Sequence, residues 1–199
     1  MSEWTYVLNG VRCPDGVVPT DRGGVRYRSD RRESYRLNAS GGKVLLEFLN
    51  AVSEGSGTQA KLERWFSRYG LLDSDDVGAS RTSLTQGEIT DAADFAGILG
   101  EKAISACQPG GGDFVPDGVL DHCQVDVAVG YDTDGSPRLE MVASNMFDFW
   151  QLEAMSLMMA GTPIETCRHC DGLFLARRSA TTCTPRCKTA QWRAERAGA

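Results

Sequence analysis

Apolar residues recur with a helical period in several stretches of this chain. Residues 43–52 read KVLLEFLNAV, with apolar side chains spaced as on one helical face and Ser40 as the expected N-terminal cap. A second amphipathic helix is expected to begin with Thr58 as its cap and to end at Gly70. Its buried face combines aromatic and aliphatic side chains: Leu62, Trp65, Phe66 and Tyr69.

Two longer helices are expected further along the chain. Residues 73–87 look like a loop, and the third helix is expected to run from Thr90 to about Cys107, before the break QPGGG. The fourth reads NMFDFWQLEAMSLMMA, with Ser144 as its expected cap and Gly161 as its end. It is apolar on nearly all sides, which is typical of a central core helix or of a dimer interface.

A period of two marks the expected strands. Val125, Val127 and Val129 alternate with other residues, and the turn DTDGSP joins them to RLEMV, which predicts a β-hairpin. Residues 3–9 alternate more weakly and are a further candidate strand. Residues 21–36 carry six arginines interleaved with acidic residues and tyrosines, a pattern that favours a solvated strand or loop. An arm that contacts nucleic acid is the alternative interpretation of that stretch.

Length and composition are those of a soluble globular protein with one domain of ordinary size and a small appendix. The chain has 199 residues, of which 41% are hydrophobic and 24% charged. It has no run of about 18 apolar residues, so no membrane span is expected. The N-terminus also lacks the basic start and apolar run of a signal peptide. We therefore expect a cytoplasmic location, where Cys13, Cys107 and Cys123 stay free thiols.

Charge is distributed unevenly along the chain, whose net charge is −6. Residues 167–199 contain seven basic and two acidic residues, a net charge of +5, and the remainder, with 14 basic and 25 acidic residues, has −11. An acidic body with a basic tail indicates an end that faces a polyanion. The alternative is a tail that is merely solvated.

Four cysteines in the basic segment, Cys167, Cys170, Cys183 and Cys187, follow the pattern C-x2-C-x12-C-x3-C. Thiolate sulfur is among the best ligands for zinc, and four thiolates complete a tetrahedral structural site with no open position. The first pair can hold the ion from one tight turn, and the second pair shares one face of a helix's first turn. We therefore predict one structural zinc ion bound by these four residues.

Other interpretations of the cysteines are open. Two disulfides are possible, but a four-cysteine cluster this short in a cytosolic protein usually marks a metal. A redox C-x-x-C motif normally lies in a βαβ pattern, and none surrounds Cys167. His169 could replace one sulfur, although four thiolates already fill the metal's shell. Because the module has few apolar residues besides Phe174, metal binding is expected to supply about 10 kcal/mol or more of its folding energy.

The segment CRHCDGLFLARRSATTCTPRCKTAQWR resembles the CGNR-type zinc finger, whose pattern is C-x2-C-x3-F, basic residues, C-S-M-x2-C and a basic helix. The preceding chain resembles, more loosely, the ABATE domain found upstream of that finger, in its LEFLN helix and in a second helix ending in GLL. The family's Cys-Gly-Asn-Arg is here Cys187-Lys188-Thr189-Ala190, and the last cysteine step is one residue tighter. The four metal ligands therefore carry over residue by residue, whereas the Gly-Asn-Arg signature does not.

The resemblance implies an α+β fold with two parts. Residues 1–162 would form a mostly helical domain with a β-hairpin, which senses a ligand or forms a homodimer. Residues 163–199 would form a small zinc module of treble-clef or ribbon-like type, in which Pro185 begins a basic helix. The implied function is that of a bacterial DNA-binding regulator of transcription. Phosphates would be contacted by basic side chains and a base edge by Gln191, giving the set Arg177, Arg178, Arg186, Lys188, Gln191, Arg193 and Arg196.

Two other functions compete with DNA binding. The zinc module could serve protein–protein interaction alone, with Trp192 and the methionine-rich helix as its contact surface. An enzyme is the third interpretation, but His122 and Cys123 are adjacent and would point to opposite faces of a strand. The glycines at 110–112 are followed by DFVP rather than by the helix start of a phosphate-binding loop. We therefore expect no enzymatic activity.

Overall fold

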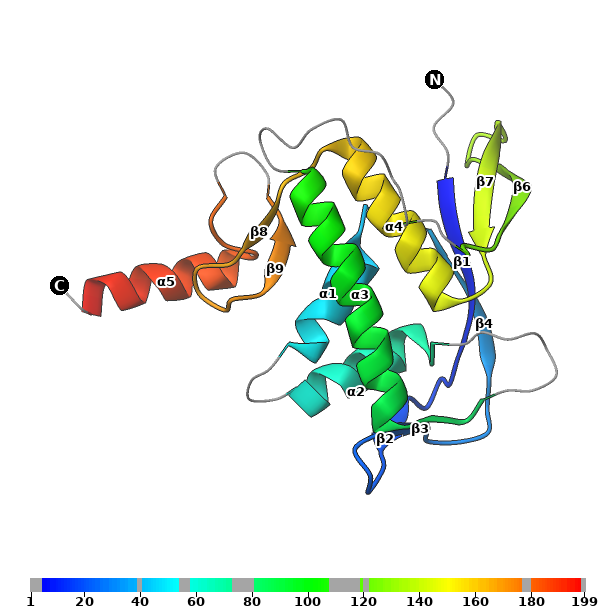
Figure 1. Ribbon diagram of the computed structural model, residues 1–199, viewed down its shortest axis with the longest axis horizontal. Coiled ribbons are helices and arrows are strands. Elements are labelled where there is room, and N and C mark those ends of the chain that lie inside the picture. Colours follow the sequence, from blue (N-terminus) through cyan, green and yellow to red (C-terminus); the bar gives the residue numbers. More distant parts are fainter. Residues whose placement is uncertain are drawn as a thin grey trace.

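The computed structural model describes residues 5–38, 41–53, 58–72, 81–107, 119, 122–176 and 180–197. The described part has five helices and nine strands, which confirms the predicted α+β class. Its N-terminal part is less helical than expected, because the predicted hairpin belongs to a four-stranded sheet and a second, smaller sheet lies beside the helices (Figure 1).

The larger sheet has the strand order β4-β1-β7-β6. The hairpin of β6 (Val125–Tyr131) and β7 (Pro137–Ala143) is confirmed, and β1 (Thr5–Arg12) lies where residues 3–9 were expected. Strand β1 pairs in parallel with β7 and antiparallel with β4 (Glu33–Asn38). The sheet therefore joins the start of the chain to a hairpin more than a hundred residues away.

The smaller sheet consists of three short antiparallel strands in the order β2-β3-β5. Their bounds are Val17–Pro19, Val25–Tyr27 and Ser83–Leu84. The arginine-rich stretch 21–36 thus contributes β3 and the first four residues of β4, in agreement with the predicted strand or loop.

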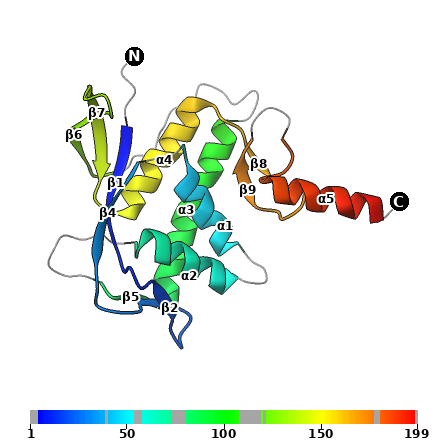
Figure 2. The same ribbon diagram turned by 180° about the vertical axis from the view of Figure 1, so that it is seen from behind.

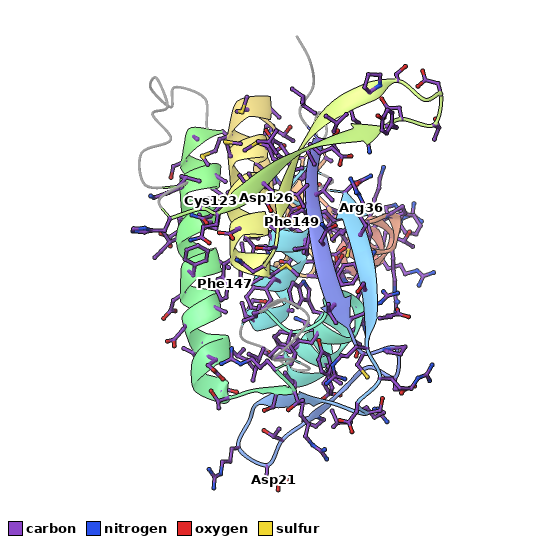
Figure 3. The ribbon with its side chains drawn as sticks, turned by 90° about the vertical axis from the view of Figure 1, so that its right-hand side faces the viewer. Asp21, Arg36, Cys123, Asp126, Phe147 and Phe149 are labelled. Atoms are coloured by element: carbon purple, nitrogen blue, oxygen red, sulfur yellow. The ribbon has the colours of Figure 1, made fainter. Side chains whose placement is uncertain are left out.

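Four helices build the body of the molecule: α1 (Lys43–Val52), α2 (Thr58–Tyr69), α3 (Gln86–Ala106) and α4 (Met146–Ala160). Helix α4 contacts β1 and β7, and α1 and α3 pack against α4 (Figures 1 and 3). Phe149 and Trp150 on α4 are fully buried, so α4 is the central core helix that its apolar sequence predicted. Phe147 extends from α4 toward α3, where its ring centroid lies 5.5 Å from that of Phe95.

The structure corrects two predicted helix starts. Helix α3 begins at Gln86 rather than at Thr90, and part of the stretch predicted as loop is therefore β5 and helix. Thr85 caps α3: its hydroxyl accepts a hydrogen bond from Glu88 N at 3.3 Å, and the Glu88 carboxylate accepts one from Thr85 N at 2.7 Å. Helix α4 is capped by Asn145 rather than by the predicted Ser144.

The N-terminus of α1 is stabilised by a residue of another helix. The predicted cap, Ser40, lies outside the described residues, and the capping position is Gly42, whose φ of 82° and close approach to Leu157 both require glycine. In place of a local cap, the buried carboxylate of Glu153 on α4 accepts hydrogen bonds from Val44 N at 3.4 Å and Leu45 N at 2.7 Å. This contact between a carboxylate and a helix N-terminus fixes α1 against α4.

The C-terminal residues 163–197, here called the cysteine module, form a hairpin of β8 (Ile164–Thr166) and β9 (Leu173–Leu175) followed by helix α5 (Pro185–Ala197). In both views of the ribbon, α5 projects away from the body of the molecule (Figures 1 and 2). Within the described part of the chain, no helix combines the length and apolarity needed to cross a bilayer.

Candidate metal centre and basic helix

The first cysteine pair lies in the tight turn between β8 and β9. Cys167 directly follows β8, its N–H donates to Gly172 O at 2.9 Å, and its carbonyl accepts from Asp171 N at 3.0 Å. Asp171 has a positive φ of 55°, which bends the chain back toward β9. The turn therefore brings the sulfurs of Cys167 and Cys170 to the same side of the hairpin.

The second pair lies at the N-terminus of α5. The Thr184 hydroxyl accepts a hydrogen bond from Cys187 N at 3.2 Å, and Pro185 is the first helical residue, as predicted. Cys183 precedes the helix and Cys187 lies in its first turn, which places both sulfurs on the side that faces the hairpin. Backbone N–H of Cys183 also donates to Cys167 Sγ at 3.4 Å, so the two pairs are joined directly.

The four sulfurs converge on one point: all lie within 4.8 Å of one another. The Sγ atoms of Cys170 and Cys183 are 3.6 Å apart, and those of Cys183 and Cys187 are 3.5 Å apart. Four sulfurs at about 2.3 Å from a tetrahedral zinc ion would be about 3.8 Å apart, whereas a disulfide bond is about 2.0 Å long. The cluster therefore has the dimensions of a metal site and is positioned to bind one ion.

The thiols of the cluster differ in how readily they ionise. Burial disfavours the Cys167 thiolate, but backbone N–H groups of the turn and of Cys183 donate to its sulfur and lower the pKa to about 6. Burial and the neighbouring thiols raise the pKa of Cys183 to about 12. Thiolates are the form that binds a metal, so a divalent ion at this position would displace protons from the cluster.

The remaining candidate ligands and cysteines lie elsewhere. His169 is exposed and is not among the residues that converge. Cys13, Cys107 and Cys123 are free, as expected, and each thiol faces a backbone carbonyl. Burial raises the pKa of the Cys123 thiol to about 11, which keeps this side chain protonated at neutral pH.

The module is attached to the body of the molecule through Asn50 on α1. The Asn50 side chain donates from Nδ2 to Leu173 O at 2.8 Å and accepts from Leu173 N at 2.7 Å. These two hydrogen bonds join α1 to the backbone of β9, close to Cys170. Sequence reasoning missed Asn50, because nothing in the local sequence of α1 indicates a partner more than a hundred residues away.

Helix α5 carries its basic residues on the half that faces away from the cluster. With 3.6 residues per turn, Arg186, Arg193 and Arg196 share one face, with Arg196 opposite Cys187, and Lys188 lies on the flank of that face. All four are exposed. Trp192 lies between Lys188 and Arg196 around the helix and is half exposed, with the Arg196 guanidinium 4.0 Å from the centroid of its ring.

The other residues predicted to contact nucleic acid are Arg177, Arg178 and Gln191. Arg177 and Arg178 lie outside the described residues. Gln191, the predicted base reader, is partly buried on the flank of α5, and its Nε2 donates to Glu195 Oε1 at 2.8 Å. Its amide would have to leave Glu195 to reach a base edge.

Comparisons with known proteins return nothing that identifies this arrangement: no family model, no curated protein and no solved structure matches the chain.

Proposed function

We propose that the cysteine module binds one structural zinc ion and that the chain is a bacterial, cytoplasmic DNA-binding regulator of transcription. The module would be of treble-clef or ribbon-like type, which is supported by a hairpin turn that carries the first cysteine pair and a helix that carries the last cysteine. Zinc suits four cysteines because it accepts tetrahedral thiolate coordination without redox chemistry. The resemblance to the CGNR-type finger and the ABATE domain supports the same assignment.

The exposed basic face of α5, anchored at one end by a metal ligand, is the observation that carries the DNA-binding proposal. A helix with its side chains is about 10–12 Å across, and the major groove of DNA is about 12 Å wide, so a projecting helix can enter it. Arg186, Lys188, Arg193 and Arg196 would then face phosphates along the groove walls. The acidic body repels DNA, so binding would be confined to this end of the molecule.

Fluorescence anisotropy with labelled random and genomic DNA fragments tests the proposal. Zinc-loaded protein is titrated between about 50 and 200 mM salt, where contact with four phosphates gives a slope of log affinity against log salt of about −3 to −4. The double variant Arg193→Ala/Arg196→Ala should weaken binding and flatten the slope by about 2. The matched variant Arg22→Ala/Arg26→Ala removes the same charge from the arginine-rich stretch 21–36. Equal losses in both variants, or no binding by folded, zinc-loaded protein, would contradict α5 as the DNA-binding element.

Protein–protein interaction is the second candidate, and the exposure of Trp192 favours it. Aromatic side chains at 50% exposure on a projecting helix are typical anchors of protein interfaces. Trp192→Ala separates the two functions, because it leaves every positive charge in place. If Trp192→Ala retains DNA binding and its salt slope, the result supports a DNA-binding regulator. If neither the unmodified chain nor Trp192→Ala binds DNA, a protein–protein interaction module is the better assignment.

A further inference from the structure

A cavity of about 430 Å³ lies between the body of the molecule and the cysteine module. Helix α1 contacts both α2 and β9, whose ribbons are seen in Figure 2, and residues of all three elements line the cavity. Its walls include Lys61, Arg64 and Trp65 from α2 and Cys170, Leu173 and Cys183 from the module. Cavities of roughly 300–1,000 Å³ between two structural units are the usual size and place for small-molecule sites.

Three cations follow one face of α2 along the cavity: Lys61, Arg64 and Arg68. Arg68 is already engaged, since its guanidinium lies 3.5 Å from the Glu47 carboxylate and 5.0 Å from the Tyr69 ring centroid. Lys61 and Arg64 are exposed and make no ion pair or hydrogen bond with any described residue. Two positive groups one helical turn apart are therefore available to an anionic group at the mouth of the cavity.

The inner surface of the cavity is mostly apolar. The Trp65 side chain is 4% exposed, and Leu173 of β9 faces the same space. The opposite wall contains Cys170 and Cys183, and four thiolates around a divalent ion carry a net charge of about −2. An anionic group would therefore be attracted to Lys61 and Arg64 and repelled from the cysteine wall, which fixes the direction in which a ligand enters.

We propose that this cavity binds a small organic anion: a carboxylate or sulfonate with an apolar, preferably aromatic, body. Lys61 and Arg64 bind the anionic group, and the body packs between Trp65 and Leu173. Such a ligand contacts α2 and β9 together, so it holds the cysteine module against the body of the molecule at the contact that Asn50 makes. The inference rests on the cavity and on the proposed metal-bound module that forms one of its walls, and it holds whether or not α5 binds DNA.

Titration of the zinc-loaded full chain with anilinonaphthalene sulfonate, a fluorescent aryl sulfonate, tests the proposal, with benzoate as a competitor. We expect saturable binding of one probe per chain, displaced by benzoate. The double variant Lys61→Glu/Arg64→Glu should weaken the binding at least tenfold, and the matched variant Arg22→Glu/Arg26→Glu, at residues of the β2–β3 region that do not line the cavity, should leave it unchanged. Zinc content and circular dichroism verify that each variant is folded.

A second variant tests the cavity without changing charge. Ser53 is an exposed residue of the cavity wall, and Ser53→Trp would fill part of the space while leaving both cations in place. Loss of probe binding in this variant as well as in Lys61→Glu/Arg64→Glu supports the site. Probe binding that is unchanged in both, or lost equally in the Arg22→Glu/Arg26→Glu control, overturns the proposal.

Discussion

The body of the molecule and the cysteine module are stabilised in different ways. The body contains a continuous aromatic cluster, in which the Phe48 ring stacks on Trp150 at 4.5 Å and packs against Trp65 at 4.8 Å. In the described part of the chain after Gly161, only Cys167 and Ala176 are buried. Hydrophobic burial therefore suffices for the body, whereas the module depends on the metal and on its contact with α1.

Metal removal should have the largest effect, because it should unfold the cysteine module and leave the body folded. Zinc binding supplies about 10 kcal/mol or more of folding energy to modules of this kind, so chelation or Cys183→Ser should unfold the β8–β9 hairpin and α5. The body should stay folded, because its buried aromatic residues are untouched. Hydrogen exchange, followed by segment, measures both outcomes in one experiment. Loss of protection in α4 along with α5 would show that the two regions are one cooperative unit.

Truncating a core side chain tests whether hydrophobic burial stabilises the body independently of the cysteine module. Trp150 is fully buried and contacts three other aromatic rings, so Trp150→Ala should destabilise the body by about 3–5 kcal/mol. Chemical denaturation monitored by far-ultraviolet circular dichroism measures the change. At low denaturant, the variant should still bind one zinc ion per chain. A variant that folds but fails to bind zinc would mean that the module takes its structure from the body rather than from the metal.

Elements defined by nearby residues were predictable from the sequence. The β6–β7 hairpin, α1 and the end of α2 at Gly70 follow from short-range periodicity and from glycine, which adopts the positive φ of 77° at that position. The start of α3 was also readable, because Thr85 and Glu88 have the spacing of a capping box, but the prediction overlooked it. The pairing of β1 with β7 was not readable, since nothing local specifies a strand partner so distant in sequence.

Part of the candidate site was likewise predictable from local sequence, and part was not. The convergence of the four cysteines was predictable, because metal geometry constrains ligand spacing along the chain. The contact between Asn50 and Leu173, and the cavity beside it, arise from packing of α1 against β9, which no spacing rule describes. The same holds for Glu153, which replaces a local cap on α1 from a different helix.

The contact between the two regions is expected to have a smaller effect than either region's own interior. Asn50→Ala removes two hydrogen bonds to the β9 backbone, which should cost about 1–2 kcal/mol. Hydrogen exchange at Leu173 should accelerate while the zinc stoichiometry stays constant. Ser53→Ala is a suitable control, since the Ser53 hydroxyl donates to Asn50 O and makes no hydrogen bond to β9 among the described residues. Unchanged exchange at Leu173 would mean that the metal alone holds β9 in place.

Lowering the pH should affect the two regions differently, and the expected change in stability is the smallest of those predicted. Metal release from the module requires only that thiolates gain protons, so it begins as pH falls below neutral. In the body, Glu140 is 1% exposed; burial opposes its ionisation, but hydrogen bonds from Arg36 and Arg138 outweigh this and lower its pKa.

A carboxyl group with a lowered pKa in the folded state stabilises the fold above its ordinary pKa of about 4.3, and this stabilisation is lost as pH falls through the folded value. Glu140→Gln should therefore destabilise the body at neutral pH, by less than Asn50→Ala destabilises the contact because Arg36 is half exposed to water. The difference between the variant and the unmodified chain should vanish in acid. Denaturant titrations from neutral pH to below about 4 measure it. A difference that stays constant across this range would show that Glu140 acts through packing over Gly130 rather than through its charge.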